Sequence, residues 1–313
     1  MEIPLLRNIG KSDRSTSPRK TQDNLTIFFF LLPAFVLFLI FLVYPIFRSA
    51  YFSLFDWNGL GPAVDFVGLD NFKEILSDQI FMKAVGNCLL IVVLSVIVQL
   101  PLSLGLAIMV GRDLPARAFF RAIFFMPYVL SEVITAIIWL GLFNPDPERG
   151  LINALLILIP GVEPQAFLSD INMVMGSIFI VLTWKYFGLH LLLYLAGLQN
   201  IPKEIEEAAV IDGANRWQLI RYITIPLLSS TIRTTIYLSV LGSLTQFNLV
   251  WIMSKGGPVN ASEMMATYMY RFGFIRFWLG YGSAVALVML LICLIFSIAY
   301  LRLMRQPDYL GNL

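Results

Sequence analysis

Six long apolar segments restrict the folds that this sequence can adopt. They cover roughly residues 27–48, 84–110, 119–142, 171–198, 227–253 and 280–303. Each is long enough for a helix to cross a hydrocarbon core of about 30 Å. Inside a bilayer every backbone N–H and C=O group needs a partner within the protein, so isolated apolar runs of this length favour helices. We therefore predict an all-α, polytopic membrane protein with six transmembrane helices.

The composition agrees with a membrane protein and excludes several other classes. Of the 313 residues, 58% are hydrophobic and only 13% are charged, which is outside the usual range of soluble domains. The net charge of +2 gives no support for a nucleic-acid partner. Cys88 and Cys293 both fall inside apolar segments, where a thiol behaves as a small hydrophobe, so neither a disulfide framework nor a metal site is expected.

The basic residues predict how the chain is oriented. Residues 1–26 form a polar, basic tail that we expect to be disordered and cytoplasmic, 27–305 form the membrane domain, and 306–313 form a second cytoplasmic tail. With the N-terminus inside, the inner segments carry about twice as many Lys and Arg as the outer ones, which favours this orientation. The outer segments hold Arg48, Lys73, Lys83, Arg149, Lys255, Arg271 and Arg276.

A polar stretch at 200–226, between the fourth and fifth spans, predicts a short helix, a turn and a second helix on the cytoplasmic side. Glu204, Glu206 and Glu207 place carboxylates near the positive end of the first helix. Gly213 is typical of a helix C-terminus, and Asn215 can cap the second helix with Gln218 in the capping-box position. The first helix is short, so it needs a surface to pack on.

The residues of this loop match a family pattern. Glu207-Ala208-Ala209 is followed after three residues by Gly213, and after nine more by Ile223-Thr224-Ile225-Pro226. This resembles the EAA loop of ABC-importer permease subunits, with Ile225 where Leu is usual. The alternative is a cytoplasmic linker whose spacing matches by chance. The resemblance implies that the first helix is a coupling helix that sits in a cleft of the ATPase, with Glu206, Glu207, Ala208, Ala209, Asp212 and Gly213 as coupling residues.

Further stretches are similar to the carbohydrate-type permeases of this family, and the similarity covers nearly the whole chain from residue 27. FDWN followed by FVGLDNF in 53–74, LAGLQNIP at 195–202, and FNLVW, GGP and YMY between 247 and 270 resemble the first permease subunit of maltose and glycerol-3-phosphate importers, the MalF and UgpA type. The extra N-terminal spans and large outer domain of the enteric maltose protein have no counterpart here, so maltose cannot be assumed.

The resemblance implies an ABC importer type I transmembrane domain in the bacterial inner membrane. Such a subunit forms half of a translocation path for a sugar, oligosaccharide or polyol. The implied partners are a second homologous permease subunit in a heterodimer, two ATP-binding subunits, an extracytoplasmic solute-binding protein and membrane lipid. ATP and Mg would then be bound by the partner ATPase, and this chain would carry no cofactor.

The ionisable side chains of Glu132, Lys185 and His190 lie deep inside predicted spans, where an uncompensated charge is costly. Glu132 lies 11 residues from Arg121 and Lys185 lies 14 residues from Gln199, so straight helices place both roughly 17 to 21 Å from the cytoplasmic edge. Two alternatives remain for the pair: a buried ion pair, or separate exposure of each charge to a wet cavity. We interpret the sole histidine as a neutral packing residue.

Polar and aromatic residues in the fourth and fifth spans are candidates for contact with the substrate. A sugar needs hydrogen-bonding groups for its hydroxyls and flat apolar surfaces for its C–H faces. Ser and Thr also serve helix packing, and Trp and Tyr also line membrane interfaces, so packing remains an alternative for each. The candidates are Gln246, Asn248, Thr245, Ser243, Trp184 and Tyr186, together with the charged Lys185 and Glu132.

No catalytic constellation is found in the sequence. It contains no phosphate-binding loop, no metal-spaced His/Cys cluster and no nucleophile motif, so we expect a transport subunit that is not an enzyme. The competing hypothesis is a stand-alone secondary transporter that uses Glu132 and Lys185 as an ion relay. The loop at 200–226 argues against it, because a stand-alone carrier does not need a coupling helix.

Overall fold

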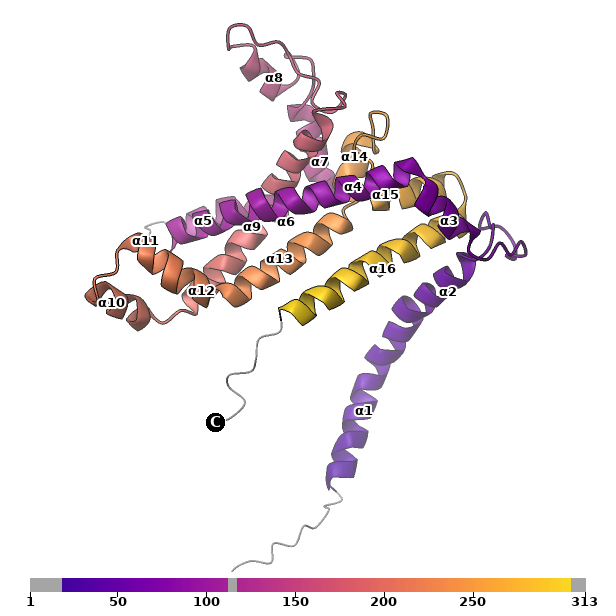
Figure 1. The fold of residues 1–313 in the computed structure, drawn as a ribbon, viewed down its shortest axis with the longest axis horizontal. Helices are drawn as coiled ribbons and strands as arrows, with labels where there is room; N and C mark the ends of the chain where they lie inside the picture. Colours follow the sequence, from indigo (N-terminus) through magenta and orange to yellow (C-terminus); the bar gives the residue numbers. More distant parts are fainter. Residues whose placement is uncertain (1–18, 112–116, 305–313) are drawn as a thin grey trace, which may run out of the picture. The chain divides into compact units, whose positions relative to one another are not determined.

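The computed structural model describes residues 19–111 and 117–304, and helices dominate both stretches (Figure 1). In these residues the extended pairing is limited to an isolated bridge between Phe55 and Phe66. Residues 1–18, 112–116 and 305–313, which include most of the predicted tails, lie outside the described residues. Helix α1 (Arg19–Phe38) already begins at Arg19, so the predicted tail at 1–26 is wrong for its last residues. Helix formation is cooperative, and polar residues with good helix propensity extend an apolar helix readily.

The chain divides into two units, residues 1–49 and 50–313. The first unit holds most of the first span, in which α1 continues through a π-helical turn (Leu39–Val43) into α2 (Tyr44–Phe52). The candidate membrane span runs over Thr26–Phe52, so its last three residues belong to the second unit. Most of its large apolar side chains are exposed, which is expected of a helix that faces lipid.

Three further spans are continuous helices within the second unit. The longest runs for 32 residues, Gln79–Val110, and consists of α4 (Gln79–Leu94), a π-helical turn (Ser95–Gln99) and α5 (Leu100–Val110). It begins at Gln79 because the Asp78 carboxylate accepts hydrogen bonds from the first free N–H groups, at 2.6 and 3.4 Å. The other two are α9 (Val174–Gln199) and α16 (Leu279–Leu303).

Two spans are broken. Helices α6 (Arg117–Val129) and α7 (Glu132–Leu142) meet at 96°, and α13 (Ser229–Leu244) and α14 (Asn248–Ser254) meet at 42°. The described residues thus give four continuous spans, or six when each bent pair counts as one span. The expectation of a straight third span was wrong. Pro127 removes a backbone N–H near the end of α6, and Ser131 starts α7 in a new direction.

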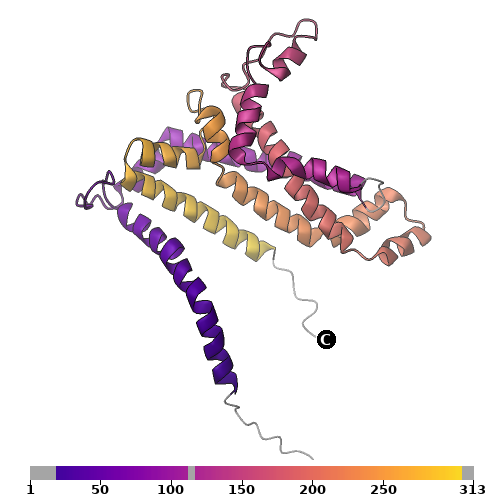
Figure 2. The same cartoon turned by 180° about the vertical axis from the view of Figure 1, so that it is seen from behind.

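Helix α9 is the centre of the packed bundle, where it contacts α5, α6 and α13 (Figures 1 and 2). Gly188 lets α6 approach closely, because a Cβ there would lie 2.1 Å from the Phe124 carbonyl oxygen. Gly197 does the same for Thr231, whose Oγ1 would be 2.6 Å from a Cβ. Small residues at helix contacts are typical of membrane bundles, in which close packing replaces the hydrophobic effect.

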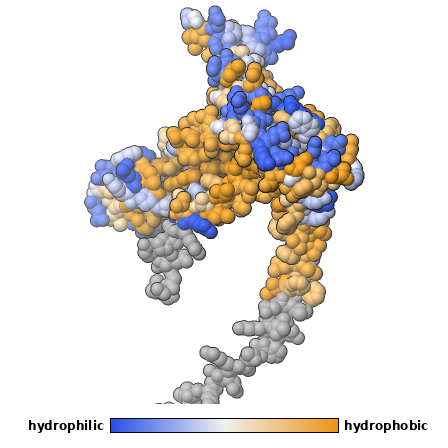
Figure 3. Space-filling view, turned by 45° about the vertical axis from the view of Figure 1, so that its right-hand side comes forward, coloured by the Kyte–Doolittle hydropathy of each residue, from blue (hydrophilic) through white to orange (hydrophobic). Residues whose placement is uncertain are grey.

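Several segments that connect the spans are held to the bundle by polar contacts. Short helices α3 (Asp70–Ser77), α8 (Leu151–Leu156) and α15 (Met265–Tyr270) lie in these segments. The Tyr268 hydroxyl donates to the Asp78 carboxylate at 2.5 Å, and the Asn87 amide donates to the carbonyls of Ala261 and Glu263, both at 2.9 Å. Figure 3 shows the helices coated with apolar side chains between more polar ends, the pattern expected of a protein that crosses a bilayer.

Candidate functional site

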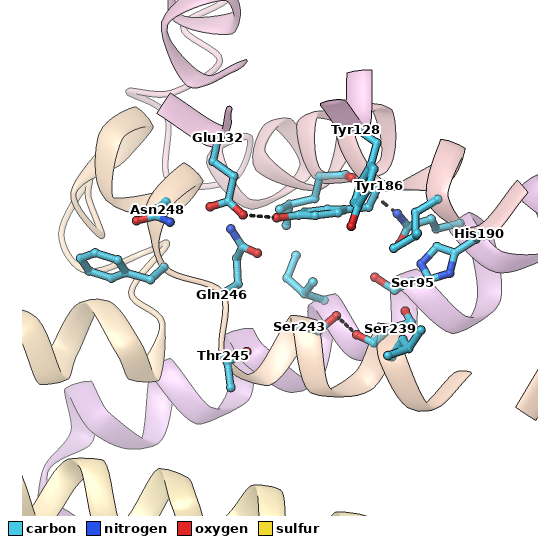
Figure 4. Close-up of a pocket in the computed structure, with 17 residues that line it drawn as sticks. Ser95, Tyr128, Glu132, Tyr186, His190, Ser239, Ser243, Thr245, Gln246 and Asn248 are labelled. Carbon is cyan, nitrogen blue, oxygen red and sulfur yellow. Dashed lines mark hydrogen bonds between the residues drawn. The ribbon is translucent and has the colours of Figure 1, made fainter. Parts of the chain in front are cut away.

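A cavity of about 370 Å³ lies where the two broken spans meet. It is lined by residues from α4 and its π-helical turn, from both breaks, from α9 and from α13 (Figure 4). Beyond the breaks, α7 and α14 pack against each other, so both breaks face the same space. The polar lining residues are Ser95, Gln99, Tyr128, Glu132, Tyr186, His190, Ser239, Ser243, Thr245, Gln246 and Asn248.

At the first break, the protein's own side chains satisfy both helix ends. The Lys185 ammonium donates to the carbonyl oxygens of Pro127 at 3.1 Å, Tyr128 at 2.8 Å and Leu130. These carbonyls belong to the end of α6, where the break leaves C=O groups without helical partners. On the other side of the break, the Ser131 hydroxyl accepts from the N–H of Ile134 at 3.2 Å and caps α7.

Glu132 and Lys185 do not form the ion pair that was one of the two alternatives from the sequence. Among the ion pairs within 19–111 and 117–304, none joins these two residues. Glu132 instead accepts a hydrogen bond from the Tyr186 hydroxyl (Figure 4). The depth comparison that paired them assumed straight helices, and the 96° bend directs α7 away from the line of α6. Of the two, only Glu132 lines the cavity.

Two polar side chains of the cavity lining, Gln246 at the second break and His190 on α9, each have a nitrogen without a protein partner. Gln246 is 7% exposed and its Nε2 has no hydrogen-bond partner; His190 is 3% exposed and its Nδ1 has none either. Figure 4 shows both side chains at the rim of the same space. Because buried polar atoms in proteins are nearly always hydrogen-bonded, two unpaired ones in one cavity indicate a place for a polar ligand or water.

Most of the candidates chosen from the sequence meet in this cavity. Glu132, Tyr186, Ser243, Thr245, Gln246 and Asn248 line it, whereas Trp184 and Lys185 do not. Trp184 packs edge-on against Trp139, with ring centroids 5.7 Å apart. His190, interpreted from the sequence as a packing residue, is part of the lining.

Sequence reasoning missed the contribution of the second span, which supplies Ser95 and Gln99. Gln99 could have indicated this contribution, since an uncharged amide inside an apolar span also requires a hydrogen-bonding partner. Tyr128 was missed for a different reason. It reaches the cavity only because α6 ends one residue later.

The lining chemistry suits a neutral, hydroxyl-rich ligand. Hydroxyl, amide and imidazole groups can each donate or accept hydrogen bonds, and Tyr128, Tyr186 and Phe247 add ring surfaces. The Lys185 ammonium, at the first break, is engaged by backbone carbonyls. The cavity lining itself contains no cationic Lys or Arg side chain.

The loop at 200–226 forms the helix pair that the sequence predicts. Helix α10 (Lys203–Ile211) carries Glu206, Glu207, Ala208 and Ala209, Asp212 is its C-cap, and Gly213 follows with a φ of +86°. The N–H of Ala214 donates to the Ala209 carbonyl at 2.9 Å and the N–H of Gly213 to that of Val210 at 3.0 Å, which together form a Schellman motif. Asn215 and Gln218 form a capping box at the start of α11 (Arg216–Leu219). No residue of α10 is buried, and Ile211 is 86% exposed.

The chain matches the family model of the binding-protein-dependent transport system inner membrane component over residues 10–306. The chain belongs to this family. It is 35% identical to a probable ABC transporter permease protein of Pyrococcus horikoshii over 90% of this chain and 97% of that protein. It is 31% identical to MsmF, the multiple sugar-binding transport system permease protein of Streptococcus mutans, over 88% of this chain and 94% of that one.

A solved structure shares the fold. A chain of the bacterial alginate ABC transporter, crystallised in complex with an alginate pentasaccharide-bound periplasmic protein, superposes with a TM-score of 0.81. It covers 92% of this chain and 96% of that chain at 24% identity. The protein is therefore a multi-pass inner membrane permease subunit of a binding-protein-dependent ABC importer. The resemblance noted from the sequence is confirmed, and the stand-alone carrier is not supported.

Proposed function

We propose that this permease subunit forms half of the translocation path for a sugar, oligosaccharide or polyol. The observation that carries the proposal is the cavity at the two breaks, with its hydroxyl, amide and aromatic lining and the unpaired side-chain nitrogens of Gln246 and His190. A saccharide presents many hydroxyl groups and flat C–H faces, and this lining complements both. The name of the sugar-transporting relative MsmF points to the same ligand class.

The proposal includes partner chains that supply energy and substrate. A second homologous permease closes the other half of the path, two ATP-binding subunits hold ATP and Mg, and an extracytoplasmic solute-binding protein delivers the sugar. Helix α10 fits the role of the coupling helix, because its short amphipathic surface is exposed and a helix of nine residues is marginal without a docking partner. Its docking on an ATPase places residues 200–226 and both termini in the cytoplasm, as the basic residues favour.

Uptake by the whole importer tests this proposal. The tagged chain is purified together with its co-purifying subunits, reconstituted in proteoliposomes, supplied with its binding protein and offered radiolabelled maltose, lactose and sorbitol. We expect accumulation of at least one of these compounds that requires ATP. Accumulation that follows an ion gradient without ATP, or purification without an ATPase, would contradict the proposal.

Two matched glycine variants test the coupling loop in the same assay. Gly213 and Gly161 both have a positive φ, +86° and +82°, and a Cβ at either would meet no atom within 4 Å. Gly213→Val therefore strains the end of α10, and Gly161→Val introduces a similar strain in an outer loop. We expect only Gly213→Val to uncouple ATP hydrolysis from uptake, as should Glu207→Lys. Equal effects of the two glycine variants would remove the coupling role.

A further inference from the structure

The side chain of Lys185 is a buried cation with an unusual set of partners. It is 3% exposed, and its nitrogen donates to the carbonyls of Pro127, Tyr128 and Leu130 at the break between α6 and α7. An ammonium group has three N–H donors, and each finds a carbonyl here. All of its hydrogen-bonding capacity is therefore used on the backbone of one break, and none is directed at the cavity.

Those carbonyls are the groups that a broken helix leaves in need of a partner. Helix α6 ends at Val129, and the last C=O groups of any helix lack intrahelical donors. They also lie at the negative end of the helix dipole, where a cation is stabilising. In a membrane interior, water cannot fill this role at low cost. Lys185, on α9, thus provides the hydrogen-bond donors that the N–H groups of a further turn of α6 would have provided.

Helix α9 contacts the α6–α7 pair at two more points. Gly188, about one helical turn beyond Lys185, allows the α6 backbone at Phe124 to pack directly on α9. Next to Lys185, the Tyr186 hydroxyl donates to Glu132, in the first turn of α7. Helix α9 therefore holds the end of α6 and the start of α7.

The break held in this way carries residues of the cavity. The Tyr128 carbonyl accepts one of the hydrogen bonds from Lys185. Tyr128 also lines the cavity, together with Glu132 and Tyr186. The Lys185 nitrogen lies 5.6 Å from the ring centre of Tyr128 and 6.0 Å from that of Tyr186, within the range of cation–π attraction. The position of Lys185 thus determines where two rings and a carboxylate meet the translocating molecule.

We propose that Lys185 is a positioning residue of the translocation path, which fixes the angle between α6 and α7 and so sets the cavity-lining positions of Tyr128 and Glu132. It acts through the backbone carbonyls of the break and does not contact the substrate. The part of this inference that concerns transport rests on the proposed function. The part that concerns the break does not, and it can be measured without any substrate.

Distances across the break provide the substrate-free test. Spin labels are attached to Ile123→Cys on α6 and Ile137→Cys on α7, both exposed in the chain, in a background with Cys88→Ala and Cys293→Ala. The labelled chain is studied within the purified importer complex by pulsed dipolar spectroscopy. We expect a narrow distance distribution with Lys185, a broadened or shifted one in Lys185→Met, and a narrow one in Lys185→Arg, which keeps the charge and the donors. An unchanged narrow distribution in Lys185→Met would overturn the proposal.

Transport per ATP provides the second test. In proteoliposomes that contain the assembled importer, we expect Lys185→Met to lower sugar uptake per ATP hydrolysed by about tenfold, because misplaced cavity residues lose oriented contacts. Lys185→Arg should restore most of it. If Lys185 served folding alone, uptake and ATP hydrolysis would fall together with the amount of complex and their ratio would not change, which contradicts positioning.

The two tests also separate this inference from the proposed function. If Lys185→Met does not assemble, Lys185→Gln, whose amide NH2 group supplies two uncharged N–H donors for the carbonyls, is measured in its place. If none of the offered sugars is transported but the distances change as expected, the sugar proposal fails and the positioning role at the break stands. If uptake of a sugar is found and the distances do not respond, the positioning role fails alone.

Discussion

The two broken spans are stabilised in opposite ways. At the α6–α7 break, the backbone ends are covered by Lys185 and Ser131. At the α13–α14 break, α14 has no side-chain cap on its first N–H groups, and the Gln246 amide nitrogen has no partner. The far end of α14 is the part that is anchored, because Arg271 donates to the carbonyl of its C-cap Lys255 at 2.5 Å.

This difference separates structural polar groups from those available to a ligand. Lys185 and Ser131 at the first break are hydrogen-bonded to the backbone, so their loss should reduce stability. The Gln246 amide nitrogen at the second break lines the cavity without a partner, so its loss should reduce transport and leave stability unchanged. The following variants test this division, from the largest expected effect to the smallest.

Arg271→Met should have the largest effect, because it breaks the anchor of α14. Arg271 forms an ion pair with Glu263 at 2.7 Å, and the Glu263 side chain is fully buried. Removing one partner of such a pair typically costs about 3 to 5 kcal/mol, since the other charge stays buried. Thermal unfolding in detergent measures this loss. The double variant with Glu263→Gln should recover much of it, and a simple sum of the two losses would show that the residues are not coupled.

Gly188→Ala should destabilise the protein by about 3 kcal/mol, because a methyl group there collides with the α6 backbone at Phe124. Gly176→Ala, in the same helix α9, is the matched control, since a Cβ there meets no atom within 4 Å. It should raise stability slightly, as glycine is a poor helix former. Similar unfolding temperatures for both variants would show that α6 can yield at this contact.

Gln246→Met should lower uptake by about tenfold without lowering the unfolding temperature. Replacing an unpaired buried amide by an apolar group of similar length is neutral or favourable for stability, while a ligand loses a hydrogen-bonding partner. Gln99→Met is the contrasting variant, since the Gln99 amide donates to the Leu182 carbonyl at 3.5 Å on the neighbouring helix. A loss of stability in Gln246→Met as large as that in Gln99→Met would contradict the prediction that the Gln246 amide is available to a ligand and has no structural role.

Ser131→Ala should cost about 1 kcal/mol of unfolding free energy, the usual effect of removing an N-cap. Thr245→Ala at the other break should cost almost nothing, because its hydroxyl only donates back to the Leu241 carbonyl of its own helix. Chemical denaturation of both variants in detergent provides the comparison. Equal losses would mean that the second break depends on side-chain capping as much as the first.

The pH dependence of stability should show the smallest effect. Burial raises the pKa of Glu263 from its ordinary value of 4.5, and the Thr267 hydroxyl and Arg271 lower it part of the way. The folded state therefore binds this proton more tightly than the unfolded state, so stability declines as the pH rises from about 4.5 to the raised pKa. Glu263→Gln should flatten the unfolding profile in that window. A profile identical to that of the parent would exclude Glu263 as its source.

Hydropathy predicted the all-α membrane fold because apolar length is a local property of the sequence. It could not predict the 96° bend between α6 and α7, because the hydropathy of a segment does not say in which direction the helix runs. The apolar character also continues through Tyr128 and Leu130, so nothing in it marks the break. The capping box of Asn215 and Gln218 was predictable, because its two residues lie within four positions and need no distant partner. The bend, in contrast, depends on contacts with residues far away in the sequence, such as Lys185.

The site was predictable in its residue types and unpredictable in its pairings. Gln246 and Asn248 were chosen because polar side chains in a span require an explanation, and both line the cavity. Lys185 was matched with Glu132 because each was the nearest opposite charge at equal depth. The partners that Lys185 actually uses are backbone carbonyls, which any residue provides, so no feature of the side-chain sequence marks them.

The length of the second span links transport to the surrounding lipid. Its 32 helical residues measure about 48 Å at 1.5 Å per residue, against a hydrocarbon core of about 30 Å. A helix that exceeds the core by this amount tilts steeply or extends beyond it, and a thicker bilayer lowers the tilt. Because Ser95 and Gln99 lie within this helix and line the cavity, a change in its tilt moves them relative to the substrate. The acyl-chain length of the membrane thus contributes to the geometry of the path.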